Sequence, residues 1–132
     1  DGADINAKGN YAASPLVNAA LAENTDMLAL ILSHQPDLYA EDSYGQLPAW
    51  HVTRRPALLA QILDAGMDPN RANSKGKTLL MAVVEDGRSA SVEVMLKHGA
   101  KVNTTDNKGR NAAWMAMSNR RHGSGIFELL IA

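Results

Sequence analysis

Apolar residues recur along the 132-residue chain at the spacing that places them on one face of an α-helix. The recurring pattern is a triplet at positions i, i+3 and i+4, which is typical of a helix that buries one side. The triplets are Leu28, Ile31 and Leu32; Leu59, Ile62 and Leu63; Val92, Met95 and Leu96; and Ile126, Leu129 and Leu130. A shorter, alanine-rich segment precedes each triplet, as at residues 15–22 and 79–84. The pattern predicts an all-α protein built from pairs of antiparallel helices.

A turn signature repeats in step with these helices. It reads Asp-Ser-Tyr-Gly at residues 42–45, Asn-Ser-Lys-Gly at 73–76 and Asp-Asn-Lys-Gly at 106–109, at intervals of 31 and 33 residues. Self-similarity at a period of this size is typical of repeat proteins. We therefore expect units in which a turn is followed by two helices.

Several helix ends are marked by residues with a physical reason to be there. Ser14, Thr78 and Asn111 can accept a hydrogen bond from the first turn of the helix that follows them. Gly66 and Gly99 can adopt the left-handed conformation that ends a helix. These positions predict where the helices begin and end.

Departures from this regular pattern fall in the first two units. Gln35-Pro36 replaces the glycine that ends the other helices, so we expect a different turn there. Leu47 precedes Pro48 and has no side-chain oxygen with which to cap a helix. The second unit is two residues short, and Pro56 is expected to open its second helix.

These positions resemble the ankyrin repeat family, whose pattern runs D-x-x-G-x-T-P-L-H-x-A-A-x-x-G and then V-x-x-L-L-x-x-G-A-x-x-N. The third unit matches it at Gly76, Thr78, Leu80, Val83, Gly87, Val92, Leu96, Gly99, Ala100 and Asn103. The resemblance implies an all-α ankyrin-repeat solenoid of helix-turn-helix units joined by β-turn loops. It divides a single domain, 1–132, into the tail of a preceding repeat (1–8) and repeats at 9–41, 42–72 (shortened), 73–105 and 106–132 (incomplete or uncapped).

Two features of the units depart from the family. The family's histidine position holds Val17, Trp50, Met81 and Trp114, so we expect larger apolar contacts in place of the histidine's hydrogen bonds. The last unit has an extra residue in its loop at 120–125, and residues 126–131 are apolar nearly all round. Because terminal repeats need a polar outer face, we expect a further helical segment at one end, or self-association through an uncapped end.

Charge and composition narrow the function classes. The chain has 13 basic and 14 acidic residues and a formal net charge of -1, so no broad positive field would attract nucleic acid. No apolar run reaches the length that spans a bilayer, so we expect a soluble protein without membrane insertion. The absence of cysteine is compatible with the cytoplasm and, if a signal peptide was removed, with a periplasmic or secreted location.

Candidate catalytic residues do not converge in the sequence. The Gly-Lys-Thr at 76–78 ends like a phosphate-binding loop, but Arg71 stands at the first glycine position and no strand leads into it. His34 and His98 share one repeat position before the terminal turn, which favours a structural role. His51 could face a partner and His122 lies in a basic, glycine-rich loop, but neither has a carboxylate at ligand spacing. We expect no enzyme activity, no cofactor and no metal site.

The resemblance implies that partners contact the turn tips and the exposed side of the first helices. Tyr and Arg, which are typical interface anchors, fall in the N-terminal half, and lysines dominate the C-terminal turns, so a partner with an acidic patch is expected. Tyr44 beside Arg54 and Arg55 is the expected hot spot. The predicted partner-binding residues are Tyr11, Tyr44, Gln46, Arg54, Arg55, Lys75, Lys77, Glu85, Asp86, Lys108, Arg110 and Asn119.

Two functions follow from this surface. The first is a module that binds a partner protein through its concave face, such as an inhibitor or immunity-type protein that covers an enzyme's active site. The alternative is a structural scaffold segment of a longer repeat protein. An enzyme would need catalytic residues beyond this chain.

Overall fold

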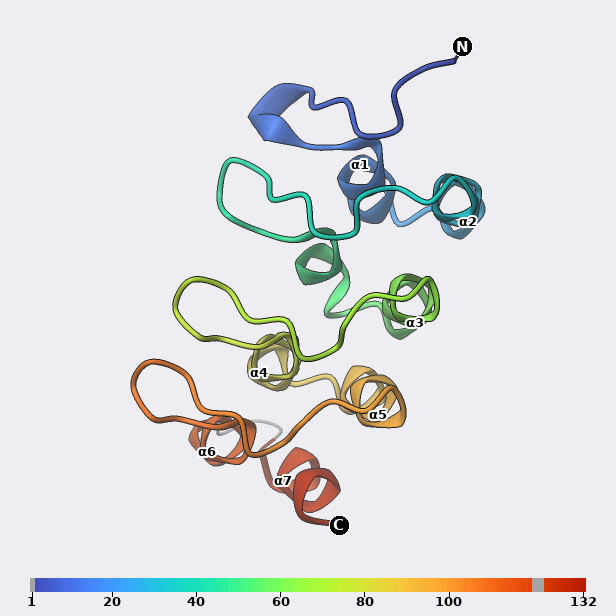
Figure 1. Cartoon of the computed structure of the whole chain (residues 1–132). Helices are drawn as coiled ribbons and strands as arrows, with labels where there is room; N and C mark the ends of the chain where they lie inside the picture. The colour runs from blue at the N-terminus through green and yellow to red at the C-terminus, as the bar shows by residue number, and fades with distance from the viewer. Residues whose placement is uncertain (1, 120–122) are drawn as a thin grey trace. The chain divides into compact units, whose positions relative to one another are not determined.

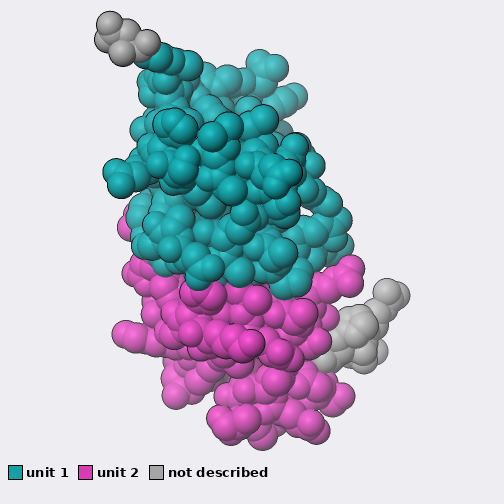
Figure 2. Space-filling model, turned by 90° about the vertical axis from the view of Figure 1, so that its right-hand side faces the viewer, with its two compact units in different colours: residues 1–67 teal, residues 68–132 magenta. Residues whose placement is uncertain are grey.

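The computed structural model describes residues 2–119 and 123–132 (Figure 1). The chain divides into two compact units, residues 1–67 (unit 1) and residues 68–132 (unit 2), which Figure 2 distinguishes by colour. Regular structure in the described residues is helical, apart from one antiparallel bridge between Ala72 and Thr78. The predicted all-α architecture of helix-turn-helix units is confirmed. No helix of the described residues is long and apolar enough to cross a membrane.

Unit 1 contains three α-helices and two short 3-10 helices in its described part. They are η1 (Asn10–Ala12), α1 (Pro15–Leu21), α2 (Thr25–Ser33), η2 (Pro48–Val52) and α3 (Pro56–Asp64). Helix α1 packs on α2 and η2, and α3 packs on α2 and η2. Leu16, Leu28, Leu59 and Ile62 are fully buried, so two of the predicted apolar triplets supply the core.

The first helix of the shortened repeat is the 3-10 helix η2 rather than an α-helix. Leu47 is extended and has no side-chain cap, and Pro48 fixes the start of η2. Pro56 opens α3 as expected, and the residue before a proline is disfavoured in helical conformation. The segment between the two prolines is therefore too short for the regular helix of the other units.

Unit 2 is built from α4 (Leu79–Asp86), α5 (Ser89–Lys97), α6 (Ala112–Ser118) and α7 (Gly123–Ile131). Helix α4 packs on α5 and α6, and α7 packs on α5 and α6. A Cβ atom on Gly123 would lie 2.0 Å from the carbonyl oxygen of Ala116, so only glycine permits this approach of α7 to α6. The expectation of a loop at 120–125 is wrong for residues 123–125, which form the start of α7, and residues 120–122, with His122 among them, lie outside the described residues.

The apolar residues of α7 differ in their burial. Ile126 and Leu130 are buried, Phe127 and Leu129 are half-buried, and Ile131 is exposed. The expectation that this end meets a further helical segment or another chain stays a prediction.

The predicted helix caps are confirmed. Ser14 and Thr78 each accept a hydrogen bond at 3.3 Å, from the backbone N–H of Val17 and Met81 respectively. Asn111 accepts one at 2.9 Å from the backbone N–H that follows three residues later. Each bond satisfies one of the free N–H groups of the first helical turn.

The turn at Gln35 differs less than the sequence suggested. Gly66 and Gly99 have φ of 105° and 84°, and Gln35 takes the same left-handed conformation with φ 51°. Gln35 and the two glycines therefore share the left-handed conformation. They differ in its energetic cost, because a residue with a Cβ atom is strained there.

The residues at the family's histidine position differ in their burial. Val17 and Met81 are buried as expected, and the sulfur of Met81 accepts the backbone N–H of Thr78 at 3.4 Å. Trp50 is half-buried, but Trp114 is 51% exposed. Trp114 is therefore the most exposed of the four, and the expectation of larger apolar contacts stays a prediction for this residue.

Candidate partner-binding surface

Three turns that carry predicted binding residues share one hydrogen-bond scheme. In each, the side-chain oxygen of the first residue accepts the backbone N–H groups two and four residues later, a pattern that fixes the turn. The bonds, at 2.9 or 3.0 Å, run from Tyr44 and Gln46 to Asp42, from Lys75 and Lys77 to Asn73, and from Lys108 and Arg110 to Asp106. The turn tips are therefore held in a defined conformation.

The tips of unit 1 carry two stacked tyrosines. The ring centroids of Tyr11 and Tyr44 are 6.0 Å apart and their planes make an angle of 24°. The side chains are 70% and 72% exposed. The backbone N–H of Ser43 donates to the carbonyl of Tyr11 at 2.7 Å, which holds the two tips together. We call Tyr11 and Tyr44 the tyrosine ledge.

Asp42 also binds His51, a contact that the sequence analysis missed. His51 Nε2 lies 2.9 Å from Asp42 Oδ2, and the carboxylate is nearly inaccessible to solvent. Burial acts to raise the pKa of Asp42, but the bonds from Gln46, Tyr44 and His51 outweigh it and lower the pKa below its usual value. The carboxylate is nine residues from His51 in sequence, so only the folding of the turn brings the two together.

Arg55, a residue of the expected hot spot, is paired with a carboxylate of its own unit. Arg55 pairs with Glu23 at 2.7 Å, and both side chains are about half exposed. The hydrogen bond and the charge of Arg55 lower the pKa of Glu23. Arg54 is exposed. Tyr44 stacks on Tyr11, so the structure groups the tyrosines together and places Arg55 against Glu23.

Two of the basic residues in unit 2 are paired with carboxylates of their own repeat. Lys77 binds Glu85. Arg110 contacts Asp106 Oδ2 through Nη2 at 2.7 Å and Nε at 2.9 Å. These bonds from Arg110, followed by the backbone bond from Lys108, lower the pKa of Asp106. Lys77 and Arg110 are therefore oriented by internal partners.

Trp114 and Met117 form an exposed apolar patch that the prediction did not include. The guanidinium carbon of Arg110 lies 5.3 Å from the centre of the Trp114 ring, and Met117 is 72% exposed. Helical periodicity could have shown this, because Met115 and Ala116 are buried and the patch faces the other way. The family's histidine position instead suggested an internal role for Trp114.

The remaining predicted residues lie near the ends of α4 and α6. Asn119 caps the C-terminus of α6 and donates through Nδ2 to the carbonyl of Glu85 at 3.4 Å. Asp86 is half-buried at the end of α4. The structure thus brings Lys77, Glu85 and Asn119 together in one network.

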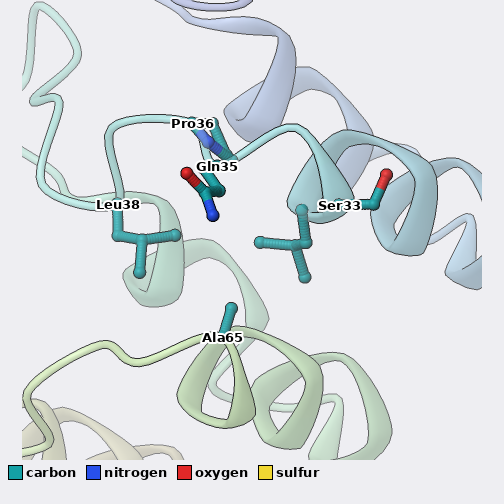
Figure 3. Close-up of a pocket in the computed structure, with 6 residues that line it drawn as sticks. Ser33, Gln35, Pro36, Leu38 and Ala65 are labelled. Atoms are coloured by element: carbon teal, nitrogen blue, oxygen red, sulfur yellow. The ribbon is translucent and has the colours of Figure 1, made fainter.

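Two of the histidines contact backbone carbonyls of the helix that precedes them. His34 and His98 each lie within 2.9 Å of a backbone carbonyl four residues earlier, in keeping with their predicted structural role. No group of three potential metal ligands occurs among the described residues. A pocket of about 470 Å³ in unit 1 has no ionisable side chain in its lining (Figure 3), which consists of Leu32, Ser33, Gln35, Pro36, Leu38 and Ala65.

Known proteins resemble this chain in sequence. A family profile described as ankyrin repeats (3 copies) matches residues 52–132. The potassium channel AKT2/3 of Arabidopsis thaliana is 31% identical over 105 residues, which are 80% of this chain and 13% of the channel. The putative ankyrin repeat protein YahD of Escherichia coli strain K12 is 28% identical over 139 residues, covering 99% of this chain and 68% of that protein. The chain therefore spans only a small part of the channel's length.

Proposed function

The chain belongs to the ankyrin repeat family, and from this premise we propose that it binds a partner protein through its turn tips and the adjoining first helices. Ankyrin repeats are generally protein–protein interaction modules. The observation that carries the proposal is that each unit exposes large side chains on its turn tips or first helices. The tyrosine ledge, Trp114 and Met117 are all more than half exposed.

Such side chains are typical of interfaces, because they remove much apolar area from water for a small loss of conformational freedom. The turn tips are already held by paired backbone hydrogen bonds to Asp42, Asn73 and Asp106. A partner would not need to order these turns, which lowers the entropic cost of association.

An inhibitor or immunity-type protein is one form of this function, in which the bound partner is an enzyme whose active site becomes covered. It predicts that a captured enzyme loses activity in the complex. A scaffold segment is the second candidate, and the similarity to 13% of a much longer channel favours it. It predicts that the bound partner keeps its activity.

Site-specific photo-crosslinking in cells that express the chain tests the proposal. A photoreactive amino acid at Tyr44 or Trp114 should yield a discrete adduct with one protein. The matched controls are the exposed positions Ala29 on α2 and Glu93 on α5, which lie on the second helices of their repeats. Equal crosslinking from the control positions, or no discrete adduct from Tyr44 and Trp114, would contradict the proposal.

A further inference from the structure

The turn tips of unit 2 carry positive charge that the protein itself does not neutralise. Lys77 and Arg110 are paired with Glu85 and Asp106. Lys75 and Lys108 are exposed, and the described residues place no carboxylate within ion-pair distance of either ammonium group. Two positive charges therefore remain available at neighbouring tips.

The backbones that carry the two lysines are also tied to each other at the turns. The backbone N–H of Asn107 donates to the carbonyl of Lys75 at 3.1 Å, and its Nδ2 donates to the carbonyl of Ser74 at 3.4 Å. A Cβ atom on Gly76 would lie 2.7 Å from Asn107 Oδ1, so the tips are packed closely. The attachment points of the two lysine side chains are therefore held close together, so one short segment with two carboxylates can contact both.

An apolar patch adjoins these charges through Arg110. The guanidinium of Arg110 is fixed by Asp106 and lies over the ring of Trp114, and Met117 is exposed one helical turn further along α6. Trp, Met and Arg are enriched in the residues that dominate binding energy or fill interface cores. The surface thus combines two separate recognition elements, a pair of cations and an apolar patch.

We propose that unit 2 binds an acidic segment of the partner protein, with carboxylates at Lys75 and Lys108 and an apolar side chain against Trp114 and Met117. This inference rests on the proposed function and names the chemistry of its partner. A nucleic acid is disfavoured because the chain has a net charge of -1 and because the described tips of unit 2 offer two uncompensated cations.

Selection of peptides from a random display library on the whole chain tests this inference. We expect the selected peptides to be rich in Asp and Glu beside one large apolar residue. The double variant K75Q/K108Q should weaken the binding of such a peptide about tenfold, because two exposed charge contacts are lost. Met117→Ala should also weaken the binding of this peptide. Raising the salt concentration should weaken the binding to the parent, in which both lysines are present, but not to K75Q/K108Q.

The matched control is K97Q/K101Q, which removes two exposed positive charges elsewhere in unit 2. It should leave the affinity within about twofold of the parent, and circular dichroism should show that all variants are folded. An equal loss of affinity in the control would show that the peptide is held by non-specific electrostatic attraction, and it would overturn the proposal. Selected peptides without an excess of Asp and Glu would also overturn the proposal. A short single-stranded DNA that binds more tightly than the selected peptides would overturn it as well.

One outcome separates this inference from the proposed function. If the selected peptides or the crosslinked partner lose affinity with Tyr44→Ala and not with K75Q/K108Q, the acidic-segment proposal fails while binding at the tips stands. If neither substitution affects a bound partner, both proposals fail.

Discussion

Both units have residues in the left-handed conformation at corresponding positions of their repeats, but unit 2 uses glycine at these positions and unit 1 often does not. Among the described residues of unit 2, the positions with positive φ are all glycines: Gly76, Gly87, Gly99 and Gly109, with φ from 72° to 84°. In unit 1, Gly45 and Gly66 serve the same purpose, yet Ala12, Glu23 and Gln35 take φ of 56°, 55° and 51°. The fold imposes this conformation even where no glycine is available.

This comparison predicts a difference in local stability. A left-handed residue with a Cβ atom costs about 1 kcal/mol that glycine avoids. Unit 1 therefore contains backbone strain that the described part of unit 2 lacks. The tips differ as well, because unit 1 presents the tyrosine ledge where unit 2 presents Lys75 and Lys108.

The largest expected effect is on unit 2, from Gly123→Ala. The new methyl group would overlap the carbonyl of Ala116, so α7 must shift from α6 at a cost of about 3 kcal/mol. Urea denaturation followed by circular dichroism measures this loss. Gly125→Ala is the control, because a Cβ there meets no atom within 4 Å, and its stability should stay near the parent or rise slightly. Equal losses in the two variants would contradict the close approach of α6 and α7.

Relief of strain in unit 1 is the next largest effect. The double variant A12G/Q35G should raise the free energy of unfolding by about 2 kcal/mol, since each glycine adopts the left-handed conformation without strain. Thermal and urea unfolding would both report the gain. The adjacent Ala13 is extended with φ -74°, so Ala13→Gly should instead destabilise the protein. A loss of stability in A12G/Q35G would show that unit 1 is not strained at these points.

A smaller effect is expected from the Asp42–His51 contact. Asp42→Asn should cost about 1 kcal/mol at neutral pH through loss of the bond to His51. The turn itself should persist, because Asn73 makes the same two backbone contacts in unit 2.

The same variant should change the acid response of the protein. The pKa of Asp42 is lowered in the folded state, so its contribution is present above the unfolded value of about 3.9 and is lost as pH falls through the folded value. The stability of Asp42→Asn should therefore decrease less steeply with acid than that of the parent, as urea titrations at a series of pH values would measure. Parallel pH profiles would contradict the contribution of Asp42.

The smallest effect is a gain in unit 2 from Ser91→Ala. The hydroxyl of Ser91 is fully buried and has no hydrogen-bond partner among the described residues. Removing the hydroxyl should raise the free energy of unfolding by about 0.5 kcal/mol, because folding then no longer has to desolvate a polar group that gains no hydrogen bond. Ser89→Ala at the exposed start of α5 is the control and should not give this gain. A destabilised Ser91→Ala variant would indicate that the hydroxyl is satisfied.

The parts of the fold that depend on local sequence could be predicted. The apolar triplets predicted the buried helix faces. The caps at Ser14, Thr78 and Asn111 could be predicted because each is a contact with the backbone only three residues later. Pro56 marked the start of α3 for the same reason.

Several contacts of the surface form only once the turns have folded and could not be predicted from local sequence. Tyr11 stacks on a side chain 33 residues later, and His51 binds the carboxylate of a turn nine residues earlier. The exposure of Trp114 was not predicted for a different reason: it stands at the family's histidine position, which suggests an internal role. Whether these residues bind a partner stays a prediction.

The bonds between neighbouring turn tips have a consequence for how this surface can evolve. In both units the tie is made by backbone groups, Ser43 N–H to the Tyr11 carbonyl and Asn107 N–H to the Lys75 carbonyl. Any amino acid but proline supplies the donor, and any amino acid supplies the acceptor. The exposed side chains at Ser43 and Lys75 are therefore free to change without altering these ties, whereas Asp42, Asn73 and Gly76 are needed to shape the turns. A single substitution at a tip can alter recognition in a descendant protein while its ability to fold is inherited intact.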